Sequence, residues 1–283
     1  MSFREYLNEA WSTHATDPKK VAEEFKQHFN LMESDDDVMA MARIIVHVCG
    51  EHLGEWIKGI ELLKKLKNNA PIKDTGEMNR YMAILNLGNN PNSSIDNFSL
   101  SDQARIYAST ASALANLGGL KNAEKFLKLA SQIAEMNLSK DDPANKAIAM
   151  TGNNVACSLE EKNERSDVEV GLMILAANLG RKYWEIAGTW KEVERAEYRL
   201  ALTCLQAGLP EESLTHAQAC LEINSQNNNE PLEVFFGFEA LAMAQKALKN
   251  QTAFERARQQ MQDAFDKLPS NDQDWYKAIL EKL

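Results

Sequence analysis

The sequence predicts an all-α protein, a solenoid of about five antiparallel helical pairs with capping helices at both ends. Five times a small residue is followed four places later by an apolar one and three places after that by another small or apolar one. Residues at these spacings share one helix face, so each stripe marks a place where a neighbouring helix comes close. The stripes are Gly59/Leu63/Leu66, Ala123/Leu127/Ala130, Gly171/Leu175/Asn178, Ser213/Ala217/Cys220 and Ala257/Met261/Ala264.

The spacing of these stripes supports a repeat architecture. They recur at intervals of 64, 48, 42 and 44 residues, which is typical of stacked helical pairs. No useful length of the chain alternates apolar and polar residues as a half-buried strand does. Each repeat of a solenoid contacts mainly its neighbours, so one core can run through all 283 residues. We therefore expect a single domain, with a cap at 1–33, repeats at 34–269 and a second cap at 270–283.

The N-terminal third shows clear helix starts. Two short helices are expected at about 2–13 and 18–30, the second with Asp17 as its N-cap and Pro18 at its first position. The acidic run Ser34-Asp35-Asp36-Asp37 then suits the start of an amphipathic helix that ends near Gly54. Residues 55–67 return as its partner and complete the first pair.

An insertion at about 70–100 accounts for the long first interval. Residues 74–87 have a helical pattern, and 88–94 are dense in turn formers. Ser101 is expected to cap a helix at 104–117, and Gly118-Gly119 then turns the chain. The remaining helices are expected at 121–136, 144–160, 167–184, 189–207, 211–223, 232–248, 253–267 and 275–283.

Charge and composition restrict the partners. The chain has 31 Lys and Arg against 41 Asp and Glu, a net charge of −10. Binding a phosphate backbone needs clustered basic residues, so we expect no nucleic-acid partner and some bias towards basic partners. The start Met1-Ser2-Phe3-Arg4-Glu5-Tyr6 lacks an apolar signal region, and no stretch approaches the roughly 18 apolar residues of a membrane span. A cytoplasmic protein without membrane contact is expected.

The four cysteines show no metal-binding or redox spacing. Cys49, Cys157, Cys204 and Cys220 lie in apolar helical contexts. We interpret them as small core residues in a reducing compartment. A disulfide between Cys204 and Cys220 across one helical pair is the alternative.

Two stretches resemble the tetratricopeptide repeat, in which the second helix carries Ala, an apolar residue four later, Ala three later, then Pro. The matching residues are Leu200-Ala201 through Gly208 to Ser213, Ala217 and Cys220, and Leu248 through Phe254, Ala257, Met261, Ala264 and Pro269, with Asn154-Val155-Ala156 and Leu159 fitting a first helix. The resemblance covers about 34–269, although the usual repeat has about 34 residues and the intervals here are longer. It implies a right-handed superhelix whose concave face holds a peptide or a partner helix, as in scaffolds and adaptors.

The resemblance also suggests a binding site. In the family members that clamp a peptide carboxylate, an Asn in one repeat works with two basic residues one turn apart in the next. Asn154, Arg195 and Arg199 occupy those places, and two guanidinium groups beside an amide suit an anion. Ala108 and Ser112 stand where the clamp has Lys and Asn, so half of the motif is present.

The alternative interpretation is structural. Arg195 and Arg199 would then pair with Glu192, Glu194 or Glu197 on their own helix. Arg105 and Tyr198 are expected on the same concave side and extend either interpretation, with Tyr198 as an aromatic anchor. Trp184 and Trp190 flank a turn and either form a recognition patch or fill a repeat junction.

No catalytic or metal signature stands out. His47, Cys49 and His52 are near one another, but in an α-helix they do not share a face at i, i+4, so no zinc site or other cofactor is expected. The chain has no nucleophile elbow, P-loop or dinucleotide fingerprint. We therefore expect a non-enzymatic adaptor that binds a protein or peptide, with a carboxylate as one group it would hold. The alternative is a peptide- or ligand-sensing regulator that changes superhelical shape on binding.

Overall fold

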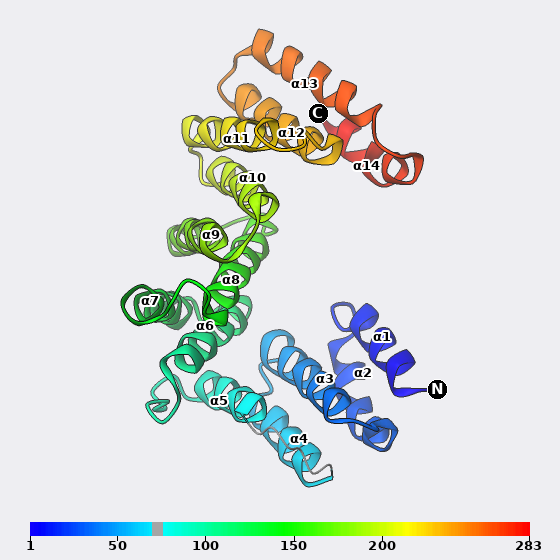
Figure 1. The fold of residues 1–283 in the computed structure, drawn as a ribbon, viewed down its shortest axis with the longest axis vertical. Coiled ribbons are helices and arrows are strands. Elements are labelled where there is room, and N and C mark those ends of the chain that lie inside the picture. The colour runs from blue at the N-terminus through cyan, green and yellow to red at the C-terminus, as the bar shows by residue number, and fades with distance from the viewer. Residues whose placement is uncertain (70–75) are drawn as a thin grey trace. The chain divides into compact units, whose positions relative to one another are not determined.

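The computed structural model describes residues 1–69 and 76–283. These residues form helices and connecting turns without any strand, as the sequence predicts (Figure 1). The chain divides into two compact units, residues 1–139 and 140–283. The predicted helix at 74–87 begins outside the described residues, and its described part is α5.

The first unit begins with short helices and ends with longer ones. Two of its segments are not α-helical: η1 is a 3₁₀-helix and η2 is a π-helix. Its elements are α1 (Phe3–Thr13), α2 (Pro18–Glu24), η1 (Phe25–Leu31), α3 (Asp35–Val46), η2 (His47–His52), α4 (Trp56–Asn69), α5 (Gly76–Asn89), α6 (Leu100–Asn116) and α7 (Leu120–Asn137).

The second unit consists of helices joined by short turns. Neighbouring helices α8 and α9, α10 and α11, and α12 and α13 pack in pairs. Its elements are α8 (Pro143–Glu160), α9 (Asp167–Ala187), α10 (Trp190–Gln206), α11 (Pro210–Ser225), α12 (Pro231–Ala247), α13 (Gln251–Phe265) and α14 (Ser270–Lys282).

Side-chain caps set most helix starts, and one predicted cap is wrong. The Ser34 Oγ accepts a hydrogen bond from the Asp37 N–H at 3.2 Å, and the Asp37 carboxylate accepts one from the Ser34 N–H, which forms a capping box. The cap of α6 is Ser99 rather than Ser101, because the Ser99 Oγ accepts from the Asp102 N–H at 3.1 Å. The helix therefore starts four residues earlier than its apolar periodicity predicts.

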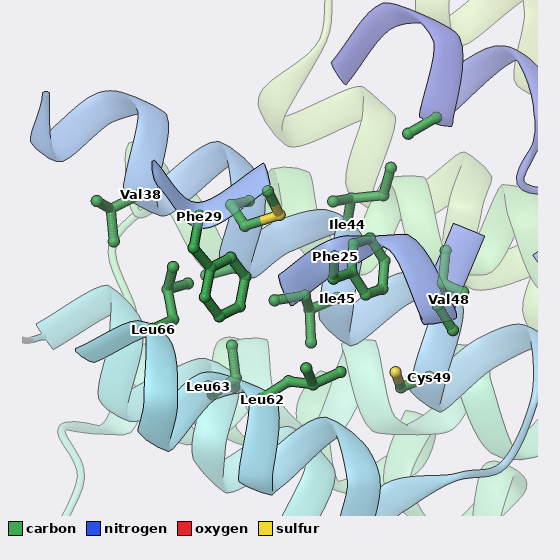
Figure 2. Close-up of a cluster of buried hydrophobic side chains, with 14 of the residues drawn as sticks. Phe25, Phe29, Val38, Ile44, Ile45, Val48, Cys49, Leu62, Leu63 and Leu66 are labelled. Carbon is green, nitrogen blue, oxygen red and sulfur yellow. The ribbon is translucent and has the colours of Figure 1, made fainter. Parts of the chain in front are cut away.

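The core of the first unit lies where η1, α3 and α4 meet. Phe25 of η1, Ile44 of α3 and Leu63 of α4 are all fully buried. Figure 2 shows this cluster, which continues to Cys49. A single α-helix at 18–30 is wrong beyond Glu24, since the chain tightens into a 3₁₀ helix that carries Phe25 and Phe29 into the core.

Four of the five predicted stripes are buried, and the third is not. In the stripe that begins at Gly171, the glycine and Asn178 are exposed. The close approach of α8 and α9 is made instead by Gly152 and Gly180: a Cβ at Gly152 would lie 2.5 Å from the Ala176 carbonyl oxygen and 2.6 Å from the Gly180 nitrogen. Small residues do bring these helices together, but on a different face of α9.

All four cysteines are free, and three of them are buried. The Cys220 thiol lies 3.4 Å from the Glu194 carbonyl oxygen, within a layer of α10, α11 and α12. None of the described helices combines the length and the apolar character that a membrane span requires.

Candidate functional site

Helix α10 carries several ionisable side chains that are largely buried in the second unit. Its start is fixed by a capping box, in which the Thr189 N–H donates to the Glu192 carboxylate at 2.7 Å. Residues four apart lie on one side of an α-helix. Glu194 and Tyr198 therefore share one side, and Arg195 and Arg199 share the adjacent side.

These four side chains line one cavity of about 360 Å³. Such a volume lies within the usual range of ligand pockets, about 300–1,000 Å³. Four helices contribute to the wall, namely α8, α10, α12 and α14. The lining residues are Asn153, Glu194, Arg195, Tyr198, Arg199, Leu232, Glu233, Phe236 and Tyr276.

Three of the five predicted binding residues thus come together, namely Arg195, Tyr198 and Arg199. On α8 the amide in the cavity wall belongs to Asn153, whereas Asn154 is exposed. Arg105 belongs to α6 of the first unit, where its guanidinium lies 3.7 Å from the Asp102 carboxylate.

The two arginines pair with other helices, so the expected pairing within α10 is wrong. The Arg195 Nη2 donates to the Glu233 Oε1 of α12 at 2.6 Å, and its Nε also donates to that carboxylate. Arg199 donates to the Glu160 carboxylate of α8. Two of the glutamates of α10 are engaged elsewhere: Glu192 caps the helix, and Glu197 binds Arg181 and His216.

Two buried carboxyl groups, those of Glu194 and Glu233, face each other beside Arg195. Glu194 and Glu233 are 1% and 3% exposed. Burial, and then the charge of Glu233, raise the pKa of Glu194 above its ordinary value. No N–H or O–H of the described residues donates to either carboxyl oxygen of Glu194. The Glu194 carboxyl group is therefore buried without a hydrogen-bond partner among the described residues.

An aromatic wall completes the cavity. The Tyr198 Oη donates to the Glu239 carboxylate at 2.7 Å, and its ring lies edge-on to Phe236 with centroids 5.4 Å apart. Phe236 in turn packs against Tyr276 of α14 at 5.2 Å. Burial, followed by the charge of Glu239, raises the pKa of Tyr198, so this phenol stays protonated.

One further polar group of the wall lacks a partner. The Arg199 Nε is buried and donates to no acceptor among the described residues. The cavity thus contains a hydrogen-bond donor and a carboxyl group that the protein itself does not satisfy. Buried polar groups are normally paired with protein atoms, water or an ion, so these two groups call for an explanation.

The first unit holds the residues that suit a metal ion. One ligand nitrogen from each of His14, His47 and His52 lies within 4.8 Å of the others. The sequence interpretation missed this cluster because it assumed an α-helix through His47 and His52, and because His14 belongs to another helix. The sequence shows that His47 and His52 are five residues apart, but it does not show that their rings meet each other and His14.

Known proteins add no assignment to this geometry. No protein-family model matches the chain, and no curated protein matches it significantly.

Proposed function

We propose that this protein is a non-enzymatic adaptor that holds a peptide segment of a partner protein in the α10 cavity. The observation that carries the proposal is the pair of unsatisfied buried groups in one wall, the Glu194 carboxyl and the Arg199 Nε. A peptide unit offers a carbonyl acceptor and an N–H donor side by side. It complements both groups at once, and leaving them unpaired costs about 1–3 kcal/mol each.

The aromatic wall gives such a peptide a place for one side chain. Tyr198, Phe236 and Tyr276 present rings on one side of the cavity. Aromatic residues dominate binding energetics because they bury large area with little loss of conformational entropy. We infer that the peptide's backbone meets α10 and that an apolar or basic side chain meets the rings.

The charge balance favours a peptide backbone over a terminal carboxylate. Glu233 and Glu160 already neutralise Arg195 and Arg199. A carboxylate ligand would have to displace one of these buried acids, whereas a neutral peptide group would not. The partner is therefore bound within a chain segment rather than by its C-terminal end.

We further infer that the helical pairs are tetratricopeptide-like repeats. In support, α6 and α7 turn at Gly118 and α10 and α11 turn at Gly208, both with positive φ. The buried stripe of Ser213, Ala217 and Cys220 on α11 supports the same assignment. Repeats of this kind commonly serve as binding scaffolds.

The test is selection from a library of linear peptides, followed by fluorescence anisotropy with the selected peptide. Glu194→Leu removes the unsatisfied carboxyl, and we expect it to weaken binding about tenfold or more. Arg256→Ala on the exposed face of α13 is the control and should leave affinity unchanged. Amidating the peptide's C-terminus should also have no effect.

The stability of Glu194→Leu distinguishes a role in binding from a role in folding. Glu194→Leu removes a buried acid and should leave the fold intact or stabilise it. Loss of binding in a variant that melts no earlier than the parent therefore reports on the cavity. Selected peptides that bind Glu194→Leu and Tyr198→Ala as tightly as the parent would refute the proposal.

A further inference from the structure

Three histidines from two segments of the first unit converge on one point. His14 follows the last turn of α1, and His47 and His52 are the first and last residues of η2. Their ring centroids lie 4.7–5.1 Å apart, and all three rings are half-buried. We propose that His14, His47 and His52 bind one divalent transition-metal ion of the zinc class.

The π-helix is what brings two of the ligands together. In an α-helix, residues five apart are separated by about 140° around the axis. In a π-helix the hydrogen bonds join residues five apart, as the Leu53 N–H does with the Val48 carbonyl at 3.1 Å. His52 is thereby placed over His47, and their Nε2 atoms lie 3.1 Å apart.

Two glycines lie in and just after the wider turn. Gly50 lies inside it, and a Cβ at this position would lie 3.1 Å from the Trp56 ring. Gly54, at φ +63°, then reverses the chain in a conformation that favours glycine. Cys49 points into the hydrophobic core and is not one of the convergent ligands (Figure 2).

Hydrogen bonds orient the rings for metal binding. The His47 Nδ1–H donates to the Glu51 carboxylate at 2.9 Å, and the His14 Nδ1–H donates to the Trp11 carbonyl at 2.6 Å. Both rings therefore present Nε2 as the unprotonated nitrogen. Metal-bound histidines nearly always donate their second nitrogen to a carboxylate or carbonyl in this way.

The carboxylate behind His47 is itself fixed. The Glu51 Oε1 accepts hydrogen bonds from the Ser112 hydroxyl and the Asn116 amide of α6, both at 2.9 Å. Its other oxygen faces His47. The arrangement is a carboxylate–histidine pair anchored by two further donors, which fixes the orientation of the imidazole ring.

The ligand set selects the metal. Neutral imidazoles suit Zn²⁺, Cu²⁺ and Ni²⁺, whereas Mg²⁺ and Ca²⁺ prefer oxygen. Zn–N bonds of about 2.0–2.1 Å place two ligands of a tetrahedron about 3.3 Å apart, close to the 3.1 Å between His47 and His52. The ligand nitrogens of all three rings lie within 4.8 Å of one another, so closing the site needs the third ring to move by about 1.5 Å at most.

Three histidines leave a fourth position for water or for a partner's side chain. This is the ligand count of open zinc sites rather than of closed structural ones. The ion would join the end of α1 to η2, two segments that the chain separates by more than thirty residues. Metal binding would then stabilise the N-terminal part of the first unit.

The experiment is calorimetric titration of the full chain, without a polyhistidine tag and stripped with a chelator, with ZnCl₂. We expect one ion per chain, and each of His14→Ala, His47→Ala and His52→Ala should weaken binding about 100-fold or more. Glu51→Gln should weaken it about 10- to 100-fold. MgCl₂ should give no binding heat.

A matched control exists in the second unit. His216 also donates from its Nδ1 to a glutamate, at 2.7 Å from Glu197, but it is not part of the cluster. His216→Ala should bind zinc like the parent. Equal affinity in His216→Ala and in the three cluster variants, or no saturable binding by the parent, would overturn the proposal.

A measurement on the unsubstituted chain guards against unfolded variants. Co²⁺ in a tetrahedral nitrogen site absorbs visible light far more strongly than octahedral aqueous Co²⁺. We expect the parent to develop this absorption at one equivalent and to lose it on adding Zn²⁺. Only the weak octahedral spectrum would contradict the site. Peptide binding in the second unit should be unaffected, so the two proposals fail independently.

Discussion

The first unit gathers ionisable side chains at an irregular helix, whereas the second gathers them along a regular one. His47 and His52 meet because η2 is a π-helix, and the His47 ring is oriented by its hydrogen bond to Glu51. Arg195 and Arg199 both line the cavity because they are one turn apart on α10. Each forms an ion pair with a glutamate of another helix. The two units therefore position their ionisable side chains by different means, a π-helix in the first and the one-turn spacing of an α-helix in the second.

We expect the largest effect on stability from breaking the buried ion pair between Arg199 and Glu160. Arg199→Met leaves the Glu160 carboxylate, 9% exposed, without its cation. We expect the free energy of unfolding to fall by about 3 kcal/mol, because an unpaired buried charge remains. Lys128→Met breaks the exposed pair with Glu124 in the first unit and should cost no more than about 0.5 kcal/mol. Urea denaturation of both variants measures the difference, and equal costs would show that the pair is not buried in solution.

Helix packing in the second unit gives the next largest effect. Gly152→Val would force side-chain atoms against the backbone of α9, and we expect it to lower stability by about 2–3 kcal/mol. Gly171→Ala on α9 enters open space and should stabilise the helix by about 0.5–1 kcal/mol. Thermal melting of the two variants tests which face of α9 packs. Destabilisation by the second substitution would restore the stripe that the sequence predicts.

The sequence predicts features that depend on local periodicity, and it does not predict those that depend on how helices pack against one another. The helices of the second unit and the grouping of Arg195, Tyr198 and Arg199 depend on periodicity, which is local, and the structure has them. The partners Glu160 and Glu233 depend on the register between helices, which no local pattern contains. The histidine cluster depends on a π-turn, which helical periodicity in the sequence does not predict.

A pH dependence distinguishes the buried acid of the second unit. The pKa of Glu194 is raised in the folded state, so the folded protein binds more protons than the unfolded chain above the ordinary carboxyl pKa. The stability that Glu194 contributes is fully present below the ordinary carboxyl pKa, and it is lost as the pH rises through the raised pKa of the folded state. Glu194→Gln should therefore flatten the decline between pH 5 and pH 9 in urea unfolding. Glu185→Gln, at a side chain that is 69% exposed, should leave the slope unchanged.

The smallest effect concerns the start of α6. Ser99→Ala removes the hydroxyl that caps this helix and should cost about 1 kcal/mol. Ser101→Ala, inside the first turn, should change stability by less than about half of that. A thermal shift of both variants decides between the two caps. A larger loss at Ser101 would favour the start that the apolar periodicity predicts.

Hydrogen exchange with and without Zn²⁺ tests most directly whether a π-turn builds a metal site in the first unit. With zinc, amides near the end of α1 and through η2 should exchange more slowly, while those of α10 in the same sample should not change. Unaltered exchange across η2 at saturating zinc, or equal slowing in both units, would contradict the account.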